Sequence, residues 1–189
     1  MNVAGHVTRR VEINGMALMV LDGLFSDENI RSLYAFLRDV PYRLNDIASN
    51  ETVYVKHWKS EFPSGLAEGT PVLRECIQAA RASMVDDRFA LDRCYTNMIL
   101  YGDFQAPHVD PPGGITALYY ANPEWKENWL GETVFYDADR QPVHAVGVKP
   151  GRMAIFHSDI LHRAGVPSRE CFEPRLSVAF TFVPRGGGG

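Results

Sequence analysis

Cysteine is scarce in this chain of 189 residues: Cys76, Cys94 and Cys171 are the only three, and they lie far apart. An odd, widely spaced set does not form a disulfide framework, and it lacks the close cysteine pairs of a structural zinc site. Reduced thiols of this kind are typical of a cytoplasm-like compartment. The sequence therefore predicts a cytoplasmic protein without disulfides.

Long hydrophobic runs and strong charge are also missing. No apolar stretch approaches the roughly 18 residues of a membrane helix, and the first ten residues lack the apolar region of a signal peptide. The formal net charge is only −4, with no block of like charges. We therefore expect no membrane and no nucleic-acid partner, whereas the oligomeric state is left open.

The hydrophobic content of 46% is enough for a substantial core, and no linker marks a second domain. We expect one domain over residues 11–184, with a hairpin and helical support at 11–90 and a β-rich part at 91–184. The ends at 1–10 and 185–189, the latter finishing in a glycine run, are predicted to be mobile.

Local signals place a hairpin and a helix early in the chain. Asn14-Gly15 tolerates the positive φ angles of a tight turn and predicts a hairpin over 11–21. Ser26 is a good N-cap, and apolar residues at helical spacing follow it. A helix is therefore predicted over 27–40.

A second helix and a series of strands follow. Thr70-Pro71 combines a capping residue with a first-turn proline and predicts a helix that ends before Asp86. Short apolar runs separated by turn residues predict strands over 91–101, 115–121, 132–136, 144–148, 152–156 and 175–183. Helices followed by many short strands predict a mostly β fold, a jelly roll with helices that buttress one sheet.

The last predicted strand indicates which face is which. Large apolar residues alternate with Arg175, Ser177, Ala179 and Thr181. The apolar face is expected to pack beneath the helices and the polar face to line a cavity. A buried arginine there needs an anion, which predicts an anionic ligand in the cavity.

The most informative residues are His108 and Asp110, in an H-x-D motif, and the later His162. Residues two apart on an extended segment point the same way, so His108 and Asp110 can share one metal ion. Two imidazoles and one carboxylate on one face of an octahedron select non-haem Fe(II) and predict an oxygenase. H-x-D alone is a weak signal, and His157 is an alternative to His162 as the distal ligand.

The stretch from Thr96 to Phe182 resembles the Fe(II)- and 2-oxoglutarate-dependent dioxygenases, specifically the prolyl-4-hydroxylase-like group. The resemblance is carried by "TNMILYGDFQAPHVD", "GRMAIFHSDILHRAGVP" and "PRLSVAFTF". It implies a double-stranded β-helix, also described as cupin-like. It also implies iron bound by His108, Asp110 and His162, and an Arg175 that clamps the distal carboxylate of 2-oxoglutarate.

The resemblance assigns further residues to the cosubstrate pocket: Tyr101, Thr116, Leu118, Tyr120, Thr133 and Ala179. It implies oxidation of an unactivated C–H bond by dioxygen, with release of succinate and CO2, and ascorbate as reductant. Since Asp110 occupies the third ligand position, hydroxylation is the expected outcome, and desaturation or ring formation stays open. The substrate is expected to be a small molecule or an amino-acid derivative.

Two alternatives remain at this stage: a peptidyl-prolyl hydroxylase of the same family, and a metal-binding, cupin-like sensor without turnover. Substrate contacts are expected from loops beside the metal, because loops on a rigid scaffold carry specificity. The candidate loops are 43–52, 56–69, 103–107 and 137–142. Within them, Lys56 and Lys59 are hypothesised to hold an anionic or carrier-attached substrate.

Overall fold

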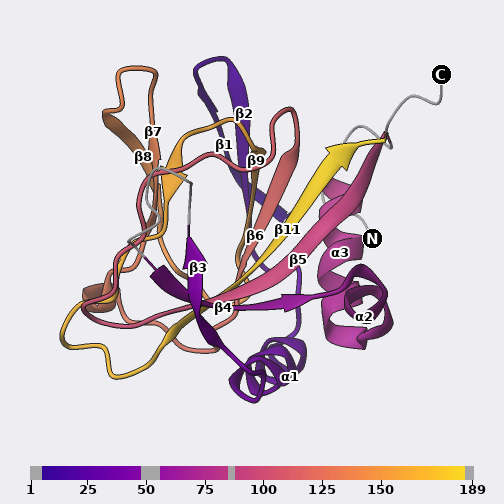
Figure 1. Cartoon of the computed structure of the whole chain (residues 1–189), viewed down its shortest axis with the longest axis vertical. Coiled ribbons are helices and arrows are strands. Elements are labelled where there is room, and N and C mark those ends of the chain that lie inside the picture. The colour runs from indigo at the N-terminus through magenta and orange to yellow at the C-terminus, as the bar shows by residue number, and fades with distance from the viewer. Residues whose placement is uncertain (1–5, 48–55, 85–87, 186–189) are drawn as a thin grey trace.

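The computed structural model describes residues 6–47, 56–84 and 88–185, and it consists mainly of antiparallel strands (Figure 1). The strands are β1 Val7–Ile13, β2 Met16–Leu21, β3 Arg43–Ile47, β4 Lys56–Phe62, β5 Phe89–Ile99, β6 Ile115–Tyr120, β7 Thr133–Tyr136, β8 Pro142–Val146, β9 Met153–His157, β10 His162–Arg163 and β11 Arg175–Pro184. The helices are α1 Asp27–Arg38, α2 Ser64–Gly69 and α3 Pro71–Ser83, with a 3-10 turn at Glu127–Trp129.

Two sheets form the body of the fold. The larger has the strand order β1-β2-β9-β6-β11-β5-β4-β3, and the smaller has the order β10-β7-β8. In Figure 1 the helices lie on one side of the large sheet and β7 and β8 on the other. This is the double-stranded β-helix, and its large sheet joins strands from both halves of the chain.

The two faces of β11 divide as predicted. Leu176, Val178, Phe180 and Phe182 belong to the core that packs against the helices. The alternate residue Ala179 belongs to a second apolar cluster, between the two sheets, together with Phe135 of β7. The period of two along a strand thus separates a purely apolar face from the face that lines the interior.

The predicted hairpin and helices are confirmed. Asn14 and Gly15 both have positive φ, at 54° and 74°, as a tight turn between β1 and β2 requires. The side chain of Ser26 accepts a hydrogen bond from the backbone of Asn29 and caps α1. Helix α3 begins at Pro71, although the Thr70 hydroxyl donates to the Leu66 carbonyl instead of capping it.

Two of the predicted substrate loops are wrong where the structure describes them. Strands β3 and β4 extend the large sheet over segments expected to be loops, and α2 follows them. The buried positions of β4 include polar His57 and Lys59, so the strand lacks the alternating hydrophobic pattern that would have predicted it. The remainder of the 43–52 segment, from residue 48, lies outside the described residues.

The predicted mobile N-terminus over 1–10 is too long, because β1 already begins at Val7. Val7 pairs with Leu21 at the far end of β2, so the hairpin uses the full length of its apolar second strand. Residues 1–5 and 186–189 lie outside the described residues. Within the described part of the chain, no helix combines the length and apolar character needed to cross a membrane.

We expect Leu33→Ala to destabilise the fold, because Leu33 of α1 is 1% exposed and belongs to the core beneath the large sheet. Truncating a buried leucine to alanine costs about 2–5 kcal/mol, from lost burial and the cavity that remains. Urea unfolding followed by circular dichroism measures the loss. The control is Ser32→Ala, at an exposed position of the same helix; an equal loss in both variants contradicts the assigned packing of α1.

Candidate functional site

A backbone bridge brings the H-x-D motif to the later histidine. The His108 N–H donates to the His162 carbonyl, and the His162 N–H donates to the His108 carbonyl, both at 2.9 Å. Because β10, which contains His162, pairs with β7, this bridge attaches the motif to the edge of the small sheet. The two histidines are therefore held side by side although 54 positions separate them in the sequence.

Three potential ligand atoms converge at this bridge. One atom from each of His108, Asp110 and His162 lies within 4.8 Å of the other two, and Nε2 of His162 is 3.7 Å from Oδ2 of Asp110. Val109, between the first two, points away and is half exposed. Two imidazoles and one carboxylate on one side of a site leave the other side of an ion open to exogenous ligands.

Both histidines are prepared for metal binding by the same local contact. Nδ1 of His108 donates to the Ala106 carbonyl at 3.0 Å, and Nδ1 of His162 donates to the Ile160 carbonyl at 2.9 Å. With its proton on Nδ1, each ring offers the Nε2 lone pair to a cation. Burial, and then the neighbouring His162, lower the pKa of His108, which favours the neutral, ligating form.

The carboxylate is oriented by hydroxyl groups of the large sheet. Thr116 of β6 donates to Oδ2 of Asp110 at 2.6 Å, and Ser158 lies 3.0 Å from the same threonine oxygen. The backbone N–H of Asp110 donates to the Ser158 carbonyl at 3.0 Å. Thr116 and Ser158 therefore fix both the backbone and the side chain of the carboxylate ligand.

Arg175, at the start of β11, is fully buried. Its guanidinium donates to the Gly131 carbonyl at 2.7 Å, to the Thr133 hydroxyl at 3.1 Å and to the Ser177 hydroxyl at 3.3 Å. Among the described residues, no carboxylate forms an ion pair with it. Burial lowers the pKa of Arg175, since the charged form loses hydration. Such a cation is stabilised by an anionic ligand.

One hollow joins the metal ligands to the buried arginine. Asp110 and His162 lie in its wall together with Arg175. The other lining residues come from β5, β6, β7, β9, β11 and two loops: Tyr95, Asn97, Gln105, Thr116, Leu118, Thr133, Phe156, Ala164, Ser177 and Ala179. A ligand with one carboxylate on Arg175 and its other end at the three ligand atoms would lie between the two sheets.

A family model described as the 2OG-Fe(II) oxygenase superfamily matches residues 95–183, which contain all three ligands and Arg175. The matched segment, just under half of the chain, belongs to this superfamily. The protein is a 2-oxoglutarate-dependent oxygenase with a His-Asp-His metal triad. No curated protein matches the sequence.

Solved structures share the fold of this oxygenase. A Pseudomonas putida prolyl-4-hydroxylase matches with a TM-score of 0.62 and 19% identity, covering 89% of this chain and 92% of its own. A viral collagen prolyl hydroxylase from Paramecium Bursaria Chlorella virus-1 matches with a TM-score of 0.60 and 16% identity, covering 87% of this chain and 95% of its own. The epimerase SnoN from nogalamycin biosynthesis matches with a TM-score of 0.64 and 15% identity, covering 88% of this chain and 77% of its own. At these identities the likeness shows the fold alone.

The donor set of this oxygenase fits Fe(II) and 2-oxoglutarate. The triad offers two imidazole nitrogens and a carboxylate, which suit ferrous iron, and it leaves coordination positions for a chelating cosubstrate. The buried, anion-free Arg175 suits the second carboxylate of a dicarboxylic acid.

The structure brings together most of the residues that the sequence assigned to the pocket. Thr116, Leu118, Thr133 and Ala179 line the hollow. Thr116 and Thr133 were expected to contact the cosubstrate. Instead the Thr116 hydroxyl donates to Asp110, and the Thr133 hydroxyl accepts from Arg175. Each therefore orients a ligand-binding side chain.

Tyr120 lies beside the hollow, in contact with its arginine. It is fully buried, and its hydroxyl donates to Thr133 at 2.8 Å. Its ring centroid lies 5.2 Å from the guanidinium carbon of Arg175. Tyr119, its neighbour in the chain, packs in the core on the other face of the large sheet. Tyr120 therefore supports Arg175 through a ring contact and a shared hydroxyl partner.

Tyr101 is the predicted pocket residue that the structure places at the surface. Its side chain is 63% exposed and does not line the hollow. Strand β5 ends at Ile99, and the chain turns where the Leu100 N–H donates to Asp103. This turn directs Tyr101 to the surface, so its assignment to the cosubstrate pocket is wrong in this structure.

His162, not His157, completes the triad. His157, at the end of β9, has its Nδ1 3.6 Å from Oδ2 of Asp159 and accepts the Asp159 backbone N–H. It does not belong to the cluster of potential metal ligands. The preference for His162 is thereby confirmed.

The two lysines of the predicted substrate loop differ in their surroundings. Lys56 is exposed, whereas Lys59 is 7% exposed and pairs with Glu61 at 2.8 Å. The ammonium group of Lys59 also lies 4.7 Å from the ring centroid of Tyr95, a residue of the hollow. Lys59 is thus close to the site, with its charge already engaged by a carboxylate.

Sequence reasoning missed several residues of the hollow, among them Tyr95, Asn97 and Gln105. Asn97 and Tyr95 stand opposite Ser177 and Ala179 in the pairing of β5 with β11. Tyr95 and Asn97 are two apart, so the sequence shows that they share one face of β5. It does not show the strand register that places them against the polar face of β11. Gln105 accepts the Ala164 N–H at 2.7 Å and closes one side of the hollow.

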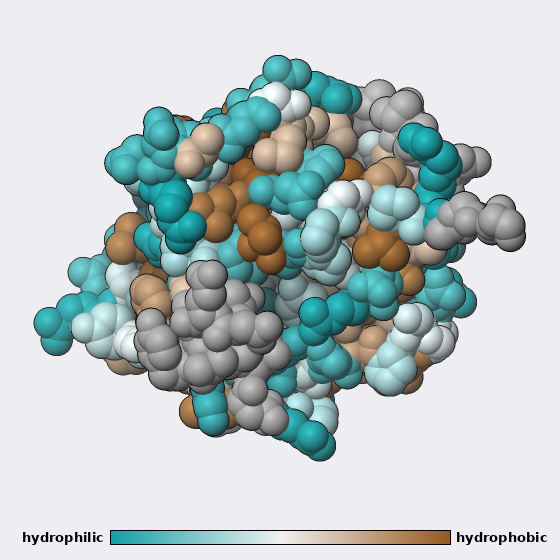
Figure 2. All heavy atoms as spheres, turned by 45° about the horizontal axis from the view of Figure 1, so that its top comes forward, coloured by the Kyte–Doolittle hydropathy of each residue, from teal (hydrophilic) through white to brown (hydrophobic). Residues whose placement is uncertain are grey.

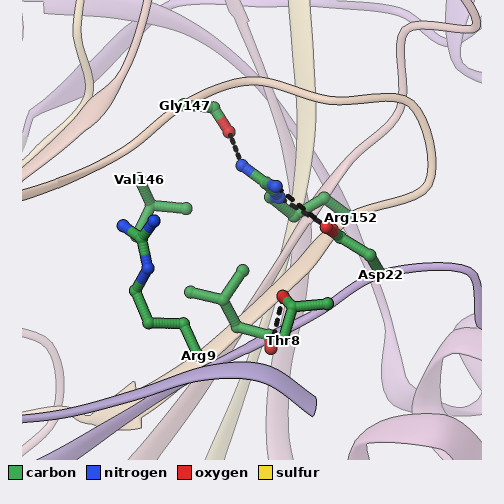
Figure 3. A pocket seen from close by; sticks show the side chains of 7 residues that line it. Thr8, Arg9, Asp22, Val146, Gly147 and Arg152 are labelled. Atoms are coloured by element: carbon green, nitrogen blue, oxygen red, sulfur yellow. Dashed lines mark hydrogen bonds and ion pairs between the residues drawn. The ribbon is translucent and has the colours of Figure 1, made fainter. Parts of the chain in front are cut away.

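A second hollow, shown in Figure 3, lies apart from the metal triad. Arg152 donates to both carboxylate oxygens of Asp22, at 2.8 and 2.9 Å, and to the Gly147 carbonyl at 2.9 Å. These bonds lower the pKa of Asp22. Asp22 and Arg152 satisfy each other, Arg9 also lines the hollow, and no residue of the metal triad does. The ion pair is therefore a structural contact between the end of β2 and the start of β9.

We expect Thr116→Val to weaken metal binding about 10- to 100-fold, the range observed when a hydrogen-bond partner of a metal ligand is removed. Valine keeps the shape of threonine but leaves Asp110 without its 2.6 Å hydrogen bond. Titration with Mn(II), followed by calorimetry, measures the affinity. Thr116→Ser keeps the hydroxyl and should restore most of it; unchanged affinity in Thr116→Val excludes the orienting role.

Proposed function

We propose that this oxygenase hydroxylates an unactivated C–H bond of a small molecule or an amino-acid derivative, using dioxygen and releasing succinate and CO2 from 2-oxoglutarate. The observation that carries the proposal is the hollow that connects the metal triad with the buried Arg175. Its two ends match the two ends of a 2-oxo dicarboxylic acid. Iron, when bound, supplies the activation of dioxygen.

The residues of the chain contribute binding and exclusion of water. Arg175 binds the distal carboxylate, and its three fixed hydrogen bonds hold the guanidinium before the ligand arrives. Leu118, Phe156 and Ala179 supply apolar wall between the sheets. These apolar side chains help to keep water from a reactive centre, which strengthens the charge interactions within it.

We infer that the substrate contacts the segment that carries H-x-D. Exposed apolar residues gather there: Leu100, Tyr101, Phe104 and Val109. On the face seen in Figure 2, hydrophobic residues form small separate groups set among hydrophilic ones, with no broad apolar patch. These features support a substrate of limited size with an apolar part, held close to the metal.

A peptidyl-prolyl substrate is the second candidate, and a sensor without turnover is the third. The peptidyl-prolyl candidate rests on the names of two structural neighbours, which are prolyl hydroxylases but share only the fold at this identity. A sensor would need the triad but not a buried guanidinium without a carboxylate partner among the described residues. We therefore favour turnover of 2-oxoglutarate.

We also propose ascorbate as the reductant that keeps the iron ferrous, and a cytoplasmic location. The second rests on three cysteines that are all buried and free. Succinate formation measured with and without ascorbate tests the first, and fractionation of cells that produce the protein tests the second.

We expect Arg175→Met to raise the KM for 2-oxoglutarate about 100-fold, as expected for loss of a bidentate charged pair. Succinate formation with Fe(II) and 2-oxoglutarate measures KM, and Mn(II) affinity should be unchanged. Arg175→Lys keeps the charge but not the planar fork, so its KM for 2-oxoglutarate should lie between those of wild type and Arg175→Met. His108→Ala should abolish succinate formation. Equal KM in wild type and Arg175→Met contradicts the assignment of the arginine.

The substrate is identified by incubating the protein, Fe(II), ascorbate and 2-oxoglutarate with pools of metabolites or peptides. We expect a mass gain of one oxygen in a component of the metabolite pool, and succinate in equal amount. A gain only in proline-containing peptides selects the second candidate. Failure to form succinate under any condition supports the sensor. The His108→Ala variant is the control for uncatalysed oxidation.

A further inference from the structure

Asn97 of β5 is a polar residue whose side chain is buried. It is 6% exposed and lines the hollow between the metal triad and Arg175. Its Oδ1 is buried and has no hydrogen-bond partner among the described residues. A buried amide oxygen without a donor is costly, so Oδ1 indicates a water or another donor in the hollow, while the NH2 group of the same side chain can donate to an anionic ligand there.

The strand register places Asn97 next to the arginine site. Asn97 stands opposite Ser177 of β11, and side chains of opposite residues lie on the same face of a sheet. The hydroxyl of Ser177 accepts a hydrogen bond from Nη1 of Arg175 at 3.3 Å. Asn97 and Arg175 therefore flank Ser177 and border the same part of the hollow.

The chemistry of the expected ligand determines which end of the amide contacts it. A carboxylate has about four lone-pair sites and donates nothing, and the fork of an arginine occupies two of them. Asn97 brings a neutral NH2 donor to the same hollow, on the sheet face of Ser177. Its oxygen needs a donor instead, which a water in the hollow would supply.

We propose that Asn97 is a cosubstrate-binding residue, whose carboxamide NH2 donates to the distal carboxylate of 2-oxoglutarate beside Arg175. The inference rests on the proposed function, because it takes 2-oxoglutarate as the ligand of this hollow. It assigns a second polar contact to the carboxylate, from the large sheet, in addition to the guanidinium. Asn97 is thereby a determinant of affinity for the dicarboxylate and not for the metal.

Calorimetric titration of 2-oxoglutarate into the Mn(II)-loaded protein tests this. In Asn97→Leu, which keeps the approximate side-chain volume, the Kd for 2-oxoglutarate should rise about 10-fold, as expected for one lost hydrogen bond to a charged group. The Kd for Mn(II) should not change. Asn97→Asp places a carboxylate beside the ligand and should weaken binding further. An unchanged Kd in Asn97→Leu overturns the proposal.

Thr181→Val is the matched control. Thr181 lies on the same strand face as Arg175 and Ser177, and its Oγ1 is likewise buried without a partner among the described residues. It does not line the hollow. The variant should leave the Kd for 2-oxoglutarate unchanged, so a rise as large as that in Asn97→Leu overturns the proposal by showing that loss of any buried polar atom suffices.

A truncated ligand locates the contact. 2-Oxobutyrate keeps the chelating end but lacks the distal carboxylate, so wild type and Asn97→Leu should bind it equally. A tenfold loss with this ligand too places the amide at the metal end and overturns the assignment. Asn97→Ser, which adds no apolar bulk, replaces the leucine variant if that one does not fold, with the same outcomes.

The outcome also separates the inference from the proposed function. If wild type binds 2-oxoglutarate and Asn97→Leu binds it equally well, only the role of Asn97 fails. If Mn(II)-loaded wild type does not bind 2-oxoglutarate, the proposed function fails and the inference fails with it.

Discussion

The reciprocal hydrogen bonds between the backbones of His108 and His162 are the constraint on which the site depends. They join a short extended segment to the small sheet and place two imidazoles and a carboxylate around one point. Each imidazole is then fixed by a carbonyl two residues earlier in the chain. The geometry of the ligands thus comes from the backbone, which explains how a segment outside the regular strands can hold a metal site.

The second constraint is the burial of Arg175. A guanidinium in the interior requires fixed acceptors, and it finds them in the Gly131 carbonyl and two hydroxyls. Gly131 has a φ of +87°, and a Cβ there would lie 3.2 Å from the arginine side chain. Trp125 packs against this position and donates to the Leu130 carbonyl. These contacts hold the turn that presents the Gly131 carbonyl to Arg175.

The fold itself does not choose the reaction. Similar structures include prolyl hydroxylases and an epimerase, so a shared double-stranded β-helix supports more than one chemistry. Three features lie around the metal and arginine site of this chain: Asn97 in the wall, the Lys59 and Glu61 pair near Tyr95, and the exposed apolar residues of the segment before and within H-x-D. Asn97 is expected to act on the cosubstrate, whereas the ion pair and the exposed apolar residues are expected to act on substrate choice.

The sequence by itself determined the metal ligands, the buried arginine and the two faces of β11, because residue chemistry and periods of two are local properties. It also determined the hairpin at Asn14-Gly15 and the start of α1. It did not reveal β3 or β4. The buried positions of β4 carry polar side chains. The sequence also misplaced Tyr101, which a turn directs outward. Only the tertiary structure decided that Asn97 faces Ser177, because pairing between strands about eighty residues apart depends on the register of the whole sheet.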